Sequence, residues 1–187
     1  MSSHRASKYH PLLATLHWVL AWFIIASLLF GFFVLARMPN VDPRKLDMLQ
    51  WHMGLGMAIF AAMAIRLVVR WRTAKPAPAG IGTPASARAA GWAHLAFYVL
   101  VFAMVATGYS TGLIARLDEI VFARSGAPLP ATFDTYPTFV AHGWIAALLA
   151  ILITLHVLGA LWHWLVRHDG VMRRMGFGGR RAVEARH

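Results

Sequence analysis

The stretch from Val140 to Trp164 contains no formally charged side chain, yet it holds two histidines, His142 and His156, 14 residues apart. At about 1.5 Å per residue this interval is about 21 Å along a helix, and it returns both imidazoles to nearly the same face. An apolar run of this length is typical of a helix that crosses a membrane. Ionisable groups inside such a helix are costly and usually functional. The stretch therefore predicts a membrane-spanning helix with two functional imidazoles at two depths.

The composition of the whole chain also indicates a membrane protein. Of the 187 residues, 59% are hydrophobic and only 13% are charged, which is about half the charged fraction of a typical soluble domain. The net charge of +11 does not indicate nucleic-acid binding, because the basic residues flank apolar segments instead of forming a patch on a soluble domain. The sequence contains no cysteine, which excludes disulfides, thiolate-ligated iron–sulfur clusters, covalent c-type haem and a cysteine nucleophile.

Four apolar segments are long enough to cross a bilayer, at about residues 12–36, 46–69, 89–115 and 137–166. The first is too long for the hydrophobic part of a signal peptide and has no convincing cleavage site, so we expect it to be retained. The connection Arg70–Arg88 is rich in proline and glycine and is predicted to be a loop. The connection Arg116–Tyr136 is long enough to cover one end of a bundle. We expect residues 1–187 to form one all-α integral membrane domain, a four-helix transmembrane bundle.

Lysine and arginine are distributed unequally between the two ends of these segments. Of the 18, 13 lie in the N-terminal tail, in the connection between the second and third segments counted from Arg66, or after the fourth segment. The other five are Arg37, Arg44, Lys45, Arg116 and Arg124, and acidic residues accompany them in the same connections. Because lysine and arginine are enriched in cytoplasmic loops, we expect both termini in the cytoplasm.

This orientation places four histidines in two pairs of equal depth. His17 and His156 lie toward the cytoplasmic side of the first and fourth segments, whereas His52 and His142 lie near the outer face. Two imidazoles on opposite sides of a flat macrocycle suit b-type haem, and zinc or di-iron would lack its usual cysteine or carboxylate ligands. We therefore expect two b haems, an outer one between His52 and His142 and an inner one between His17 and His156. The alternative is that these histidines serve packing or hydrogen bonding.

The interval of 14 residues recurs at three other positions. Gly31 and Gly108 follow His17 and His94 at this distance, and a glycine there would let a haem ring approach the backbone, although small residues in spans also serve helix packing. Arg66 follows the second-segment histidine in the same way. It could neutralise a propionate of the inner haem, or it could be a boundary arginine whose guanidinium reaches the membrane surface.

The order and spacing of several short motifs resemble the bacterial cytochrome b561 family, four-helix di-haem proteins of the inner membrane. The matching elements are Leu16-His17-Trp18, Gln50-Trp51-His52-Met53-Gly54, Gly91-Trp92-Ala93-His94, Ala141-His142-Gly143, Leu155-His156 and Trp162-His163. They cover about residues 8–175. The resemblance implies a multi-pass protein of the bacterial inner membrane in which the four paired histidines ligate the iron of two b haems.

Small members of that family imply a reaction in which superoxide is oxidised to oxygen at the periplasmic face and the electrons reduce ubiquinone. Arg44, Lys45, Arg116 and Arg124 lie on the predicted outer side and could attract a small anion. The alternative for each of them is ordinary solvation in a loop.

A quinone would need a hydrogen-bond donor near the inner haem. His163 and His94 lie toward the cytoplasmic ends of the fourth and third segments, and either could protonate a reduced quinone because histidine titrates near neutral pH. Trp162 and Trp92 could line the pocket, although tryptophan at a membrane boundary is more often an interfacial anchor.

Two other functions fit the sequence. In the first, the chain is a cytochrome b subunit that passes electrons between quinone and a periplasmic hydrogenase- or dehydrogenase-type partner, which could dock on Arg116–Tyr136. In the second, it is a membrane anchor or scaffold whose histidines are incidental.

Overall fold

The computed structural model describes residues 10–73 and 84–168, which are almost entirely helical. The four long helices are α1 (Pro11–Phe33), α2 (Arg44–Arg72), α3 (Pro84–Ile114) and α4 (Pro137–Trp162). Three short helical turns follow α1, α3 and α4, and they are η1 (Leu35–Arg37), η2 (Asp118–Phe122) and η3 (His163–Arg167). Several basic residues used to predict the orientation lie outside the described residues, namely Arg5, Lys8, Lys75, Arg173, Arg174, Arg180, Arg181 and Arg186.

The long helices correspond to the four predicted segments and differ from them at the ends. Proline begins α1, α3 and α4, since its fixed φ suits the first helical turn and its missing N–H is not needed there. α3 accordingly begins at Pro84, before the predicted start of the third segment. At its other end, α2 continues to Arg72, beyond the predicted end of the second segment. The prediction of a loop throughout Arg70–Arg88 was therefore wrong at both of its ends.

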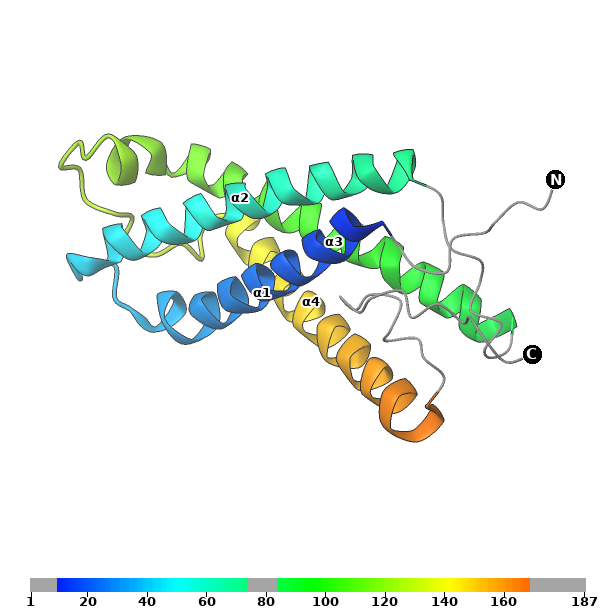
Figure 1. Ribbon diagram of the computed structural model, residues 1–187. Coiled ribbons are helices and arrows are strands. Elements are labelled where there is room, and N and C mark those ends of the chain that lie inside the picture. Colours follow the sequence, from blue (N-terminus) through cyan, green and yellow to red (C-terminus); the bar gives the residue numbers. More distant parts are fainter. Residues whose placement is uncertain (1–9, 74–83, 169–187) are drawn as a thin grey trace, which may run out of the picture.

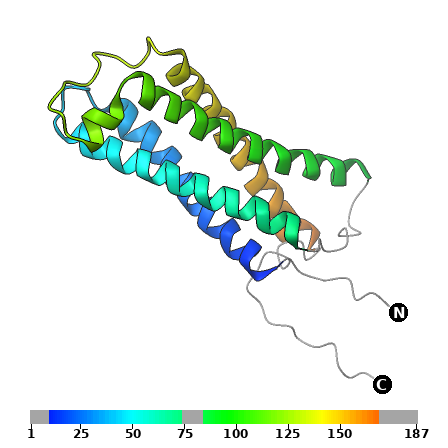
Figure 2. The ribbon, with the colours of Figure 1, turned by 90° about the horizontal axis from the view of Figure 1, so that it is seen from above.

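The helices form two antiparallel hairpins with a looser seam between them. α1 packs most closely on α2, and α3 on α4, whereas α4 makes few backbone contacts with α1 or α2. Figure 1 shows α4 clearly tilted relative to α2. The α1–α2 and α3–α4 connections lie together at one end of the bundle (Figures 1 and 2), which we call the loop end, and the other we call the terminal end.

Two groups of buried side chains hold the bundle together. One includes residues of all four long helices and comprises Leu20, Ile59, Met63, Tyr98, Val101 and Leu149. The other lies at the loop end and comprises Ala115, Leu117, Ile120, Val121 and Phe133, with Leu46 and Leu49 of α2 packed against it. The side-chain amide of Asn40 also donates to the carbonyl oxygen of Pro130 at 2.8 Å. The α3–α4 connection therefore packs over this end of the bundle, as the sequence predicted.

Most large apolar side chains of the long helices face outward. Four candidate membrane spans have mean hydropathies of 1.8 to 2.6, and no more than 17% of the most apolar window of each is buried inside the chain. A soluble protein rarely exposes apolar surface of this extent, so lipid is the medium that would cover it. The predicted all-α, four-helix transmembrane bundle is confirmed.

Exposed tryptophans mark both ends of the apolar surface. On α2, Trp51 and Trp71 have exposed fractions of 74% and 75%, and they lie about 30 Å apart along the helix at about 1.5 Å per residue. On α4, Trp144 and Trp162 are exposed in the same way. Because tryptophan collects at membrane interfaces and a hydrocarbon core is about 30 Å thick, these positions fit the two faces of one bilayer.

Candidate functional site

Four imidazoles face one another in two pairs across the seam between the hairpins. His52 of α2 and His142 of α4 have ring centroids 6.3 Å apart and planes 77° from parallel; we call them the loop-end pair. His17 of α1 and His156 of α4 have centroids 6.2 Å apart and planes 73° from parallel; we call them the terminal-end pair. These are the partners that sequence reasoning predicted from depth alone.

The separations suit a metal ion held between two imidazoles. A metal–imidazole bond is about 2.0 Å long and the ring centroid lies about 1.1 Å beyond the nitrogen, so two rings on opposite sides of one metal have centroids about 6.2 Å apart. Both pairs match this value. Across residues 10–73 and 84–168 no group of three or more His, Cys, Asp or Glu could hold a metal ion. Each pair thus offers two imidazoles, and an iron porphyrin needs two such ligands from the protein.

The loop-end pair is enclosed by glycines. A Cβ added to Gly108 of α3 would lie 3.0 Å from Cε1 and 3.2 Å from Nδ1 of His142, and one added to Gly31 of α1 would lie 3.7 Å from Cε1 of His52. Both glycines were predicted to lie at this level. A Cβ at Gly31 would make an ordinary van der Waals contact, whereas one at Gly108 would crowd His142, so Gly108 is the position where the missing side chain matters.

The Nδ1 atoms of both loop-end imidazoles have hydrogen-bond partners. Nδ1 of His142 lies 3.0 Å from the carbonyl oxygen of Met104 and 3.2 Å from the hydroxyl of Thr107. A carbonyl only accepts, so Nδ1 carries the hydrogen and Nε2 keeps the lone pair that a metal needs. Nδ1 of His52 lies 3.4 Å from the hydroxyl of Ser27. The partners come from α3 and α1, so all four long helices contribute to this level of the bundle.

The terminal end holds a third imidazole. His94 of α3 has its ring centroid 6.1 Å from that of His156, and its Nδ1 lies 2.6 Å from the carbonyl oxygen of Ala90. Distance alone therefore does not decide which histidine shares a metal with His156. Packing does favour His17, because α3 and α4 pack closely on each other whereas α1 and α4 leave a looser seam.

The other residues predicted for a quinone pocket lie at the terminal end as well. His163 begins η3 and is half-buried. Trp92 and Trp162 have exposed fractions of 70% and 57%, which suits interfacial anchors better than the walls of a closed pocket.

Arg66 of α2 is buried, with an exposed fraction of only 7%. One terminal nitrogen donates to the hydroxyl of Tyr98 at 2.5 Å, and the guanidinium carbon lies 5.5 Å from the centroid of that ring. Within the described parts of the chain Nε is buried with no hydrogen-bond partner. The alternative of a boundary arginine that reaches the membrane surface is thus wrong, and a buried cation with a spare donor is suited to a carboxylate ligand.

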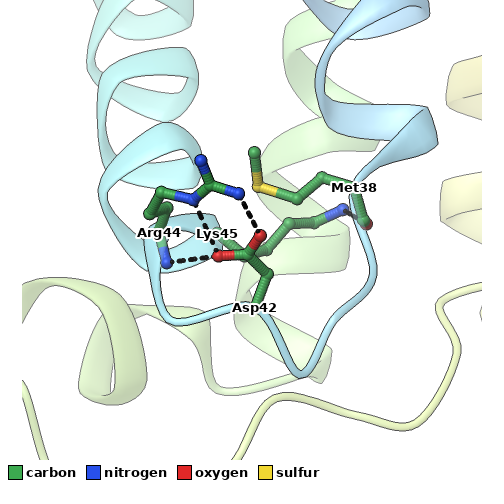
Figure 3. Close-up of polar contacts among 4 residues, drawn as sticks. All are labelled: Met38, Asp42, Arg44 and Lys45. Carbon is green, nitrogen blue, oxygen red and sulfur yellow. Dashed lines mark hydrogen bonds and ion pairs between the residues drawn. The ribbon is translucent and has the colours of Figure 1, made fainter.

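The cations predicted to attract an anion at the loop end are already engaged. Arg44 binds Asp42 through Nε and a terminal nitrogen at 3.1 and 2.8 Å (Figure 3). The hydrogen bonds from Arg44 lower the pKa of Asp42 to about 2, so this carboxylate stays charged at neutral pH. Arg116 pairs with Glu119, and Arg124 pairs with Asp47 and Gln50.

Lys45 differs from these three because it is buried, with an exposed fraction of 5%. Its ammonium donates to the carbonyl oxygens of Leu35 and Met38 at 2.5 and 2.7 Å, and Figure 3 shows it reaching toward Met38 from the start of α2. The lysine satisfies carbonyls left over at the end of α1 and η1. The alternative of ordinary solvation in a loop is therefore wrong for Lys45, whose ammonium is held inside the chain.

Two comparisons with known proteins concern nearly the whole chain. The family model for prokaryotic cytochrome b561 matches residues 8–178. Cytochrome b561 homolog 2 of Escherichia coli (strain K12) is 26% identical over 174 residues, which make up 90% of this chain and 90% of that protein. The matched range contains all four long helices and every histidine of the two pairs.

We predict that Gly108→Ala destabilises the bundle, because the added methyl group meets His142 at 3.0 Å and hydrogen bonds hold that ring in place. A clash of this kind typically costs about 1–3 kcal/mol. Thermal unfolding in detergent measures the change. Gly143→Ala is the matched control, since a Cβ there meets nothing within 4 Å. Equal stability of the two variants would contradict the prediction.

We predict that Lys45→Met lowers stability, because it leaves the buried carbonyl of Leu35 in η1 and the partly buried carbonyl of Met38 without this donor. Each such group costs about 1–3 kcal/mol. Arg44→Met is the matched control and should change the unfolding temperature little, since its ion pair with Asp42 is exposed. A larger loss in the Arg44 variant would show that the exposed pair is the important one.

Proposed function

Since the chain belongs to the prokaryotic cytochrome b561 family and is thus a membrane electron carrier of that type, we propose that it holds two b haems. His52 and His142 would ligate one haem iron, and His17 and His156 the other. The observation that carries this proposal is the pair of imidazole separations, 6.3 and 6.2 Å, at two levels of one bundle. When bound, each haem would supply one-electron redox chemistry.

The chain's own residues would bind and orient the haems. Gly31 and Gly108 leave space beside the loop-end imidazoles, and the carbonyl of Met104 holds His142 in the tautomer whose Nε2 can ligate. Nε of Arg66 lacks a partner within the described residues, so it would donate to a propionate at the terminal end. Tyr98 holds the guanidinium in place for this contact.

We place both termini in the cytoplasm, because 13 of the 18 lysines and arginines belong to the N-terminal tail, to the sequence from Arg66 to Arg88 or to the sequence after α4. The loop-end pair then lies near the periplasmic face of a bacterial inner membrane and the terminal-end pair near the cytoplasmic face. His142 and His156 are about 21 Å apart along α4. Electron transfer between the two haems would therefore cross much of the bilayer.

The proposed reaction is superoxide:ubiquinone oxidoreduction. Two superoxide anions each give up one electron at the periplasmic side and leave as oxygen, and one ubiquinone takes up the two electrons and two protons to become ubiquinol. Support comes from the resemblance to small members of the family. Attraction of superoxide by Arg44, Lys45, Arg116 and Arg124 is not part of the proposal, since these cations are paired or buried.

His94 and His163 would supply the protons to ubiquinone at the terminal end. The short contact from Nδ1 of His94 to the carbonyl of Ala90 fixes that ring and leaves Nε2 to take up a proton and release it. His163 lies at the same end of the bundle, at the start of η3.

We predict that the purified protein reduces a soluble ubiquinone when superoxide is generated, and that superoxide dismutase abolishes the reaction. His52→Ala should lower the rate to the uncatalysed background, whereas His94→Gln should lower it by about 10²-fold, as expected for loss of a proton donor, without loss of haem. His168→Ala, at an exposed histidine, is the control. A protein that reduces quinone only with an added hydrogenase- or dehydrogenase-type partner would instead be the cytochrome b subunit of a larger complex.

We predict that His156→Ala loses one of the two haems and keeps the other, because His156 belongs only to the terminal-end pair. Haem content per chain and the reduced-minus-oxidised absorption spectrum measure this. His94→Ala is the matched control and should retain both haems. Two haems in His156→Ala would refute the proposed ligation, and one haem in His94→Ala would assign the axial position to His94 instead of His17.

A further inference from the structure

The two histidine pairs differ in the hydrogen bonds made by their Nδ1 atoms. At the loop end, Nδ1 of His142 has two acceptors within 3.2 Å, the carbonyl of Met104 and the hydroxyl of Thr107, and Nδ1 of His52 has the hydroxyl of Ser27 at 3.4 Å. At the terminal end, neither His17 nor His156 makes a comparable hydrogen bond with another described residue. The surroundings of the two pairs are therefore asymmetric.

Thr107 is arranged to accept a hydrogen bond from His142. Its hydroxyl lies 2.8 and 3.0 Å from the carbonyl oxygens of Ala103 and Met104, which can only accept, so its hydrogen points back along α3. A lone pair of the hydroxyl oxygen is then left for the Nδ1 hydrogen of His142. In the hydrogen bond between the two residues, Nδ1–H of His142 is therefore the donor and the hydroxyl oxygen of Thr107 is the acceptor.

A charge difference adds to this asymmetry. Arg66 is buried and follows His52 by 14 residues on α2, about 21 Å toward the terminal end. A positive charge near a redox centre favours its reduced form, which carries one positive charge fewer. An imidazole that donates from Nδ1 is a more basic ligand and favours the oxidised form. Both effects make the loop-end site the harder one to reduce.

We propose that Ser27 and Thr107 are positioning residues that make the loop-end haem the one of lower midpoint potential, so that electrons pass spontaneously from the loop end to the terminal end. The inference rests on the proposed ligation by the two histidine pairs. It assigns the direction of transfer to side chains on α1 and α3 that contact the imidazoles of His52 and His142. Hydrogen bonding around the ligands is a recognised determinant of haem potential.

The test is a spectroscopic redox titration of the purified holoprotein. Two midpoints are expected, and in His156→Ala only the lower one should remain. Ser27→Ala and Thr107→Val should each raise this lower midpoint and leave the higher one unchanged. The Ser27→Ala/Thr107→Val double variant should favour reduction by on the order of tenfold, which is about 59 mV for a one-electron couple. Thr107→Ser, which keeps the hydroxyl, should leave the lower midpoint potential unchanged.

Matched controls separate this inference from simple damage to the fold. Thr154→Val also removes a threonine hydroxyl from a membrane helix, but that hydroxyl bonds only the carbonyl of Ala150 in its own helix, so both midpoints should stay unchanged. Arg66→Gln should lower the higher midpoint. The inference is overturned if both haems are present and Ser27→Ala and Thr107→Val leave the lower midpoint unmoved, or if His156→Ala retains the higher one. Retention of two haems in His156→Ala would overturn the proposed ligation itself.

Discussion

The facing of imidazoles across a loosely packed seam is the arrangement on which the rest of this structure depends. α4 supplies one histidine to each pair, and α1 and α2 supply the partners from the other hairpin. Close contact within each hairpin and sparse contact between them leave α4 free to stand apart from α1 and α2. A flat ligand between the hairpins would complete the packing that the chain alone leaves open, so folding and ligand binding are expected to be coupled.

Polar groups inside the bundle have partners, because lipid offers none. Serine and threonine hydroxyls meet the loop-end imidazoles, Tyr98 meets Arg66, and the ammonium of Lys45 meets two carbonyls at the end of α1. Among the fully buried side-chain nitrogens and oxygens of the described residues, Nε of Arg66 has no partner. In a site already suited to haem, this unsatisfied donor is the feature that most directly indicates an anionic group of a bound ligand.

The charged residues at the loop end bear on whether an anionic electron donor would be attracted to this end of the bundle. Counted from the sequence, they form a group of cations, but in the folded chain Arg44, Arg116 and Arg124 bind nearby carboxylates and Lys45 is internal. Long-range attraction of an anion depends on charge that is not cancelled locally. Transfer at this end would therefore rest on the redox properties of the site more than on steering.

The sequence alone determined the four apolar spans and predicted the relative depths of His17, His52, His142 and His156, because hydropathy, segment length and the rise per residue are local properties of a helix. It thereby predicted both histidine pairs. It could not determine the third imidazole beside His156, the burial of Arg66 against Tyr98 or the internal position of Lys45. These depend on how each helix is rotated about its axis and which neighbour it meets, and only the packing of the two hairpins sets that rotation.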